Sequence, residues 1–309
     1  MPWVVGIDEA GYGPTLGPLV QAAVAVKLPD ADPAGWETLR PWVRRHAEKD
    51  KTRLLVDDSK LVNSGPHGLK KLEAGLVALL GLRDTTFGGW LDAHAVAHVV
   101  AEMRGEAWFD PAEALPLHPA PPDLRPALAE VGVELFALAV KLVPAPSFNR
   151  TVAVSGTKST VLNIGVTGLL GAIGDRLPGF DPVEVLCDKL GGRNAYGPLL
   201  QGAFPGGWVV AEVESAEESR YRVEGLGRAV RVAFRPRADG ESIAVALASM
   251  TAKYLREVSM RQFNRHWQTH LPALKPTAGY PVDGARFYAE IAPLLAGLNL
   301  ADADVRRSR

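Results

Sequence analysis

The chain has 309 residues, of which 47% are hydrophobic and 22% charged, and its formal net charge is -1. This composition is that of a globular protein with ample length for a large core. The near-neutral charge excludes a nucleic-acid binder that works through overall basicity, so any such binding must come from a local basic face.

The single cysteine, Cys187, rules out an internal disulfide and is typical of a reducing cytoplasm. Acidic residues from position 8 onward argue against a signal peptide. No apolar run reaches the roughly 18 residues of a membrane span. We therefore expect a cytoplasmic protein that does not contact a membrane, and we expect a monomer.

Hydrophobic periodicity predicts elements along the whole chain. An apolar run over 3–9 predicts a strand, and a glycine-rich turn joins it to an antiparallel strand over 18–27. The other predicted elements are helices over 35–49, through the Leu69–Leu79 stripe, around 92–104, over 157–174, 241–267 and 284–296, and strands over 133–143, 183–188, 208–214, 220–225 and 228–235. This order predicts a mixed-sheet α/β fold.

Two adjacent carboxylates, Asp8 and Glu9, end the first strand and lead into the glycine-rich turn. In a water-excluding site they would repel each other and lose solvation, and a divalent cation with hard oxygen ligands, Mg²⁺ or Mn²⁺, relieves both costs. Gly11 and Gly13 let a polyanion approach the backbone, because neither carries a Cβ. This layout suits phosphodiester chemistry.

The first segment, Gly6-Ile7-Asp8-Glu9-Ala10-Gly11, resembles the first motif of type 2 ribonucleases H, the ribonuclease HII family. Four later stretches, in the family's order, resemble its other motifs: Asp58–Leu61, Val185–Asp188, Asp239–Lys253 with its Ala-Ser-Met-Thr-Ala-Lys run, and Gly279–Pro281. The resemblance implies a ribonuclease H-like α/β fold with a C-terminal helical region. It also implies a single catalytic domain over 1–309, with insertions at about 82–132 and 213–236.

The resemblance implies that Asp8, Glu9, Asp188 and Asp239 are the catalytic residues and hold two divalent ions, Mg²⁺ or Mn²⁺. Such ions, about 3.5–4 Å apart, activate water on one side of a phosphorus and stabilise the leaving oxygen on the other. Glu241 is the alternative to Asp239 as fourth carboxylate, because it follows two residues later in a glycine-containing turn.

Substrate-binding residues are implied in the same way: Gly11, Tyr12, Gly13, Lys60, Ser249, Lys253 and Tyr280. The glycine-rich turn would grip the ribonucleotide and its 2′-hydroxyl, the group that distinguishes RNA from DNA. Tyr12 stands where the family has arginine, and tyrosine cannot make a bidentate phosphate contact. We therefore predict an altered preference at the RNA–DNA junction. Lys189, in place of the family's glycine, is a second departure.

The implied activity is metal-dependent endonucleolytic cleavage of RNA in RNA–DNA hybrids, or at ribonucleotides embedded in duplex DNA, leaving 3′-hydroxyl and 5′-phosphate ends. Two alternatives stay open: a hybrid-binding protein of the same fold without turnover, and a related nuclease that acts on DNA structures. Residues 155–160 (Ser-Gly-Thr-Lys-Ser-Thr) look like half a P-loop, but Thr151 stands where the first glycine is needed.

Overall fold

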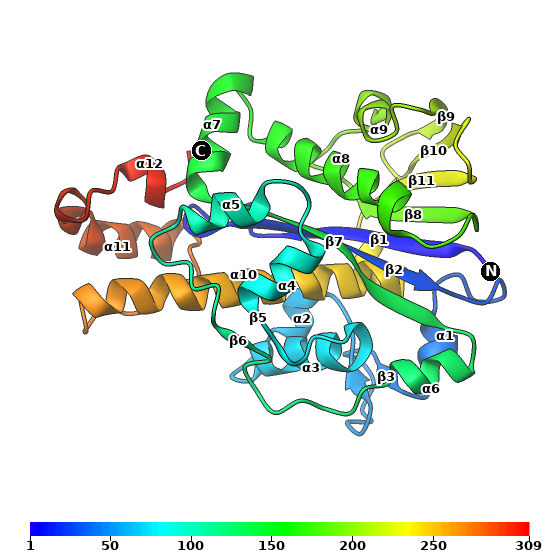
Figure 1. Cartoon of the computed structure of the whole chain (residues 1–309), viewed down its shortest axis with the longest axis horizontal. Helices are drawn as coiled ribbons and strands as arrows, with labels where there is room; N and C mark the ends of the chain where they lie inside the picture. Colours follow the sequence, from blue (N-terminus) through cyan, green and yellow to red (C-terminus); the bar gives the residue numbers. More distant parts are fainter. Residues whose placement is uncertain (309) are drawn as a thin grey trace.

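The computed structural model describes residues 1–308. Its centre is a seven-stranded mixed sheet (Figure 1). The strands are β1 (Trp3–Ala10), β2 (Leu19–Lys27), β7 (Glu134–Val143), β8 (Val183–Asp188), β9 (Trp208–Glu214), β10 (Ser219–Glu224) and β11 (Val230–Arg235). Their order in space is β7-β2-β1-β8-β11-β10-β9. The predicted mixed α/β fold, with a mixed central sheet flanked by helices, is confirmed.

Two short ladders lie outside this sheet, and helices make up most of the remaining structure. The ladders pair β3 (Val43–Arg44) with β4 (Leu54–Leu55) and β5 (Thr85–Thr86) with β6 (Ala114–Leu115). The helices are α1 (Trp36–Leu39), α2 (Ser59–Val62), α3 (Gly68–Leu80), α4 (Phe87–His94), α5 (Val99–Arg104), α6 (Arg125–Glu130), α7 (Ala145–Ser155), α8 (Ser159–Arg176), α9 (Gly197–Ala203), α10 (Ile243–His270), α11 (Pro281–Ile291) and α12 (Asp302–Val305), with 3₁₀ turns η1 (Ala238–Gly240), η2 (Ala292–Leu294) and η3 (Ala296–Leu298).

The register of β1 places the two strand-end aspartates side by side. β1 runs antiparallel to β2 and parallel to β8, and Ile7 pairs with Cys187 across the parallel ladder. Asp8 and Asp188 are the next residues on these two strands. Neighbouring residues of paired strands point to the same face of a sheet, so both carboxylates leave the sheet at one level and on one side.

Helices cover both faces of the sheet, and α10 and α8 lie on opposite sides of it in Figure 1. Side chains alternate along β1, so Val4 and Ala10 enter a core with α3 and α10, whereas Val5 and Ile7 enter a core with α8 and α9. By the same alternation Asp8 lies on the α10 face.

Helix α10 approaches β1 unusually closely because Gly6 has no side chain. A Cβ at Gly6 would lie 2.1 Å from the carbonyl carbon of Ala244 and 2.2 Å from the Val245 nitrogen, so any larger residue would push helix and strand apart. The many alanines of α10 allow the same close packing. This contact brings the first turns of α10 to the end of β1 where Asp8 lies.

The C-terminal helices form a third core against the glycine-rich turn that follows β1. Leu16 from that turn packs with Phe263 and Trp267 of α10 and Phe287 of α11. In Figure 1 α12 lies beside α7, where the Asn149 side-chain amide donates to the carbonyl of Ala303 at 2.9 Å. The predicted C-terminal helical region thus packs on the segment that follows the first strand.

Two predicted helices are wrong in extent. The helix expected over 35–49 stops at Leu39, because Pro41 has no amide hydrogen and its ring clashes with the preceding turn. The single helix expected around 92–104 is two helices, α4 and α5, because the Val96 amide donates to the Val140 carbonyl of β7 between them.

The two segments predicted as insertions have different places in the fold. The segment 213–236 supplies β10 and β11, and β11 pairs along its whole length with β8. The segment 82–132 carries α4, α5 and α6, whose buried side chains pack with the core on the α10 face. That either segment is an insertion relative to other proteins stays a prediction.

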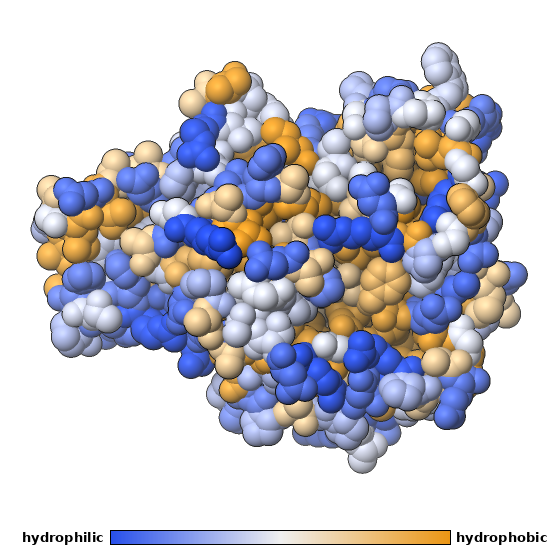
Figure 2. Space-filling view, viewed as in Figure 1, coloured by the Kyte–Doolittle hydropathy of each residue, from blue (hydrophilic) through white to orange (hydrophobic). Residues whose placement is uncertain are grey.

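The surface is chemically mixed. Figure 2 shows hydrophilic and hydrophobic side chains interspersed over one face, with hydrophobic ones gathered near its middle. Across residues 1–308, none of the helices combines the length and the hydropathy that a membrane crossing needs.

Candidate active site

Three of the four predicted metal ligands lie at the ends of β1 and β8. Asp8 is buried, and Glu9 and Asp188 are partly exposed. Asp239 lies in η1, directly before α10. The Arg237 amide donates to Asp188 Oδ1 at 2.9 Å, which fastens the turn that carries Asp239 to the end of β8. Three separate elements therefore present the four carboxylates to one region.

Burial raises the pKa of every one of these four carboxyl groups. The pKa of Asp8 lies well above its usual range, and the charge of Glu9 adds to the effect of burial. Burial, followed by the charge of Asp188, raises the pKa of Glu9 to about 7. For Asp239 the charges of Asp58 and Asp188 add to burial. The carboxylates are close enough to oppose one another's ionisation, so the site lacks positive charge.

One lysine supplies part of that charge. The ammonium group of Lys60, on α2, lowers the pKa values of Glu9, Asp188 and Asp239 against the effect of burial. It therefore lies within electrostatic range of three carboxylates on three different elements. The predicted role of Lys60 in substrate binding stays a prediction.

Asp239 and Glu241 differ in what they face. The Glu241 carboxylate is paired with the Arg235 guanidinium at 2.9 Å. Asp239 instead experiences the charges of Asp58, Asp188 and Lys60. Of the two alternatives that the sequence leaves open, this geometry favours Asp239 as the fourth carboxylate.

Ser249 is buried close to Asp8. Its hydroxyl donates to the Ser59 hydroxyl at 3.0 Å, and hydrogen bonding with Ser249 lowers the pKa of Asp8 against the effect of burial. These contacts join α10 to α2 near the end of β1. The substrate-binding role that the sequence predicts for Ser249 stays a prediction.

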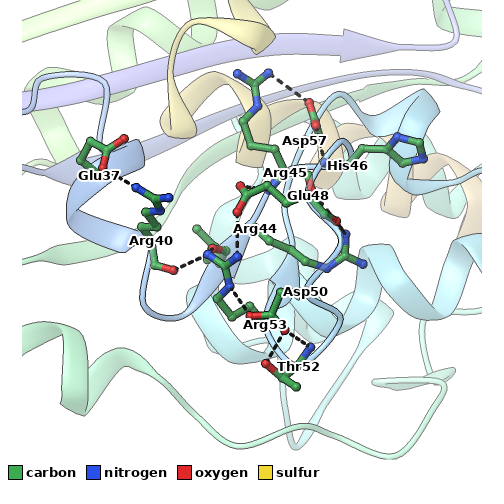
Figure 3. Close-up of polar contacts among 11 residues, drawn as sticks. Glu37, Arg40, Arg44, Arg45, His46, Glu48, Asp50, Thr52, Arg53 and Asp57 are labelled. Carbon is green, nitrogen blue, oxygen red and sulfur yellow. Dashed lines mark hydrogen bonds and ion pairs between the residues drawn. The ribbon is translucent and has the colours of Figure 1, made fainter.

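A polar network around β3 and β4 fixes the start of α2 (Figure 3). The buried Asp57 carboxylate accepts hydrogen bonds from the Arg45 guanidinium at 3.3 Å and from the amides of His46 and Asp58 at 2.8 and 2.9 Å. Asp58 caps α2 by accepting from the Lys60 amide at 2.8 Å. The network therefore fixes the first turn of α2, the helix that carries Lys60.

The two glycines of the glycine-rich turn have different surroundings. Gly11 has φ +89°, and a Cβ there would lie 2.7 Å from the Arg256 side chain. Gly13 has no heavy atom within 4 Å of the position where its Cβ would stand, beyond its chain neighbours. Packing requires Gly11, whereas Gly13 leaves open space in front of the backbone.

Two buried arginines donate hydrogen bonds to carbonyl oxygens of the glycine-rich turn. Arg256 of α10 donates to the carbonyl of Pro18 at 2.7 Å and to that of Leu16 at 3.2 Å. Arg307 donates to the carbonyl of Gly11 at 2.7 Å and to that of Pro14. These bonds occupy carbonyl oxygens of the turn, so the shape of the backbone is fixed without substrate.

Tyr280 and Lys253 are the remaining predicted substrate-binding residues. Tyr280 is half-exposed, and the carbonyl of its neighbour Gly279 accepts the Thr15 amide at 2.8 Å. Tyr280 thus lies near the glycine-rich turn, and its contact with substrate stays a prediction. The Lys253 ammonium is paired with Glu257 one helical turn further along α10, so its charge is compensated inside the protein.

Sequence reasoning missed the contributions of Asp58, Lys158 and Arg307. Asp58 belongs to the Asp58–Leu61 motif, but the effect of its charge on Asp239 depends on the fold. Lys158 lies 4.9 Å from the centre of the Tyr12 ring, and its sequence position gives no signal of that contact. Lys189, which follows Asp188, stands where the ribonuclease HII motif has glycine. Its ammonium donates hydrogen bonds to the Asn194 side chain, the Arg193 carbonyl and the Ser219 hydroxyl, so these bonds are made within the protein.

The donor set fits a hard divalent cation. All four groups are carboxylates, the ligands that Mg²⁺ and Mn²⁺ prefer, and their raised pKa values mark negative charge that needs a counter-ion. Across residues 1–308, however, no three His, Cys, Asp or Glu side chains are already gathered into a metal-binding group.

Neither protein-family models nor curated proteins match this chain. Among solved structures, it is similar to the ribonuclease H2 from Pyrococcus horikoshii OT3, with 14% identity, a TM-score of 0.48 and 98% of this chain aligned to 92% of that one. It is also similar to Bst-RNase HIII in complex with Mn²⁺, with 18% identity and a TM-score of 0.45, although it spans only 66% of that protein.

A third similar structure is the RNase HII of the PCNA:RNase HII complex from Archaeoglobus fulgidus, with 18% identity, a TM-score of 0.40 and 99% of this chain aligned to 94% of that one. At these identities and TM-scores the likeness does not by itself assign an activity to this chain.

Proposed function

We propose that this protein is a metal-dependent endonuclease that hydrolyses RNA paired with DNA, or duplex DNA at an embedded ribonucleotide, and that it works as a single catalytic domain. The observation that carries the proposal is the placement of four carboxylates at the ends of β1 and β8 and in η1, all with raised pKa values and three of them within electrostatic range of the ammonium of Lys60. Pairs of titratable groups that perturb one another in this way are typical of functional sites.

In this proposal Asp8, Glu9, Asp188 and Asp239 hold two divalent cations, Mg²⁺ or Mn²⁺. When bound, such ions supply an activated water and neutralise the charge that develops on the phosphate. Ser249 keeps the Asp8 carboxylate in one orientation through its hydrogen bond. The chain needs no side-chain nucleophile, and the products carry 3′-hydroxyl and 5′-phosphate ends.

The glycine-rich turn is proposed as the nucleotide-binding element. Gly11 and the arginines behind it fix the turn, and the open space before Gly13 leaves its backbone accessible to a sugar and its phosphate. Tyr12 and Tyr280 offer hydroxyls and rings on either side, which suit a ribose 2′-hydroxyl. Lys60 is proposed as the cation nearest the reacting phosphate. Cytoplasmic location and a monomeric state stay predictions.

The test is cleavage of three labelled substrates of one sequence, each with Mg²⁺ or Mn²⁺. These are a DNA duplex with a single ribonucleotide, a full RNA–DNA hybrid and an all-DNA duplex. We expect cutting 5′ of the ribonucleotide, cutting of the hybrid, or both, and loss of all cutting in Asp8→Asn.

The other outcomes separate the alternatives that the sequence leaves open. Cutting of the all-DNA duplex at a similar rate would favour a structure-specific DNA nuclease. Binding of the hybrid without any cutting, in both metals, would favour a non-catalytic hybrid-binding protein. Cutting that persists in Asp8→Asn would contradict the assigned site.

A further inference from the structure

Lys158 makes a contact that crosses between distant parts of the chain. It belongs to the exposed turn that joins α7 to α8, and its Nζ lies 4.9 Å from the centre of the Tyr12 ring. An ammonium over an aromatic face is attracted by the ring's quadrupole. The contact therefore ties a cation from the α7–α8 turn to the glycine-rich turn of the candidate site.

Tyr12 is held in place on both sides. Its ring is partly buried against a small apolar cluster that includes Leu19, Phe148 and Leu162. Burial raises the pKa of the Tyr12 hydroxyl, and the nearby charge of Glu9 raises it further. Tyr12 thus experiences the charge of Glu9 and contacts the ammonium of Lys158, so it joins the α7–α8 turn to the glycine-rich turn.

Among the residues that the structure describes, no carboxylate forms an ion pair with Lys158. Within residues 1–308 the lysines that form ion pairs are Lys27, Lys141 and Lys253. Lys158 is also the N-cap residue of the 18-residue helix α8, where the helix dipole disfavours a cation. Its ammonium therefore keeps hydrogen-bond donors for an anion.

The neighbouring hydroxyls do not compete for this role. Thr157 Oγ1 and Ser159 Oγ bond to each other at 3.1 Å, and the Ser155 hydroxyl donates within its own turn. Lys158 is the one charged side chain among residues 155–160. The segment that looks like half a P-loop in the sequence thus presents a single cation toward Tyr12.

We propose that Lys158, held on the ring of Tyr12, contacts a backbone phosphate of the nucleic-acid strand next to the phosphate that is cleaved. This inference rests on the proposed function. It assigns to the α7–α8 turn the cation that the glycine-rich turn itself lacks, because residue 12 is a tyrosine. Lys158 is a binding residue here and touches no reacting atom.

Salt dependence of binding tests the contact directly. We would measure binding of the duplex with one ribonucleotide by Asp8→Asn protein, which holds substrate without cutting it, over a series of KCl concentrations. Adding Lys158→Gln is expected to weaken binding about five- to tenfold at low salt. It should also reduce the slope of log K against log salt by about 0.9, the value for one phosphate contact on duplex DNA.

Matched variants distinguish the loss of this contact from the loss of one positive charge elsewhere on the protein. Lys51→Gln removes an exposed lysine from the loop before β4 and is expected to leave the slope unchanged. Lys158→Arg should keep the slope. In Tyr12→Leu, which removes the ring, Lys158→Gln should have little further effect, whereas in Tyr12→Phe it should act as in the parent protein.

Two results would overturn the inference, and only the second would also overturn the proposed function. If the parent protein binds the duplex and Lys158→Gln leaves its salt slope unchanged, Lys158 contacts no phosphate and the proposed function stands. If the wild-type protein neither cuts nor binds the duplex or the hybrid, the proposed function fails and this inference fails with it.

Discussion

Two buried acidic residues of this protein, Glu73 and Asp8, have opposite surroundings. Glu73 on α3 is 2% exposed and accepts hydrogen bonds from the amides of Leu117 and His118 at 2.7 and 2.8 Å, from the His118 ring and from the Tyr254 hydroxyl. Asp8 is 9% exposed, and the charge that affects its pKa most is that of another acid, Glu9.

The difference separates a structural carboxylate, Glu73, from Asp8, which we propose to be a metal ligand. The donors around Glu73 come from α10 and from the loop before α6, so this carboxylate fastens a peripheral segment to the core. The carboxylates around Asp8 have few donors and raise one another's pKa values, which costs folding free energy in the absence of a ligand. Burial of an acid alone therefore does not identify a site; its partners do.

The largest expected effect is on catalysis. Asp8→Asn removes one ligand charge and should reduce the rate of ribonucleotide cleavage by about 10³-fold or more. Because the substitution also removes a buried charge beside Glu9, the melting temperature of the metal-free variant should be equal to or higher than that of the wild type. A variant that loses both activity and stability would mean that Asp8 is structural, like Glu73.

Glu73→Gln should show the reverse pattern. It replaces a carboxylate that accepts four hydrogen bonds, so we expect a loss of about 3 kcal/mol in the free energy of unfolding, measured by urea denaturation. The folded variant should keep the wild-type kcat, because Glu73 does not contact the candidate site. A selective loss of kcat with unchanged stability would contradict the assignment of Glu73 as a structural carboxylate.

The two glycines of the turn sharpen the same distinction. Gly11→Ala should destabilise the protein by about 2–3 kcal/mol, because φ is +89° and the new methyl group would lie 2.7 Å from Arg256. Gly13→Ala should change stability by less than about 0.5 kcal/mol and raise KM for the duplex, because its methyl group enters open space that the substrate is proposed to use. Thermal unfolding and steady-state kinetics on both variants test this pair.

The last expected effect is on stability as a function of pH. The pKa of Glu9 rises from 4.5 to about 7 on folding, so its contribution to stability is present below about 4.5 and is lost as pH rises through about 7. The metal-free protein should thus lose on the order of 2 kcal/mol between pH 5 and 8. Glu9→Gln should flatten this slope, and an equally steep slope in the variant would assign the effect elsewhere.

Much of the fold follows from local sequence. The first strand, its antiparallel neighbour, the three-stranded meander and the long alanine-rich helix all have the expected bounds within a few residues, because each has a strong hydrophobic period. The failures lie where tertiary contacts decide. Pro41 ends the helix expected over 35–49, and the hydrogen bond of Val96 to β7 divides the helix expected around 92–104.

The sequence predicts only part of the candidate site. Asp8 and Asp188 end apolar strands, and that position suggests a shared sheet edge. The choice of Asp239 over Glu241 needs the ion pair of Glu241 with Arg235, and the role of Ser249 needs the close approach of α10 to Gly6. The contact of Lys158 with Tyr12 joins residues far apart in the chain, and no local pattern encodes it.

The most direct test of the central claim is to locate Mn²⁺ in crystals by anomalous diffraction. The account predicts anomalous peaks between the carboxylates of Asp8, Glu9, Asp188 and Asp239, and their loss in crystals of Asp8→Asn. Saturating Mn²⁺ without a peak at these carboxylates, or with peaks only at other acidic residues, would contradict it.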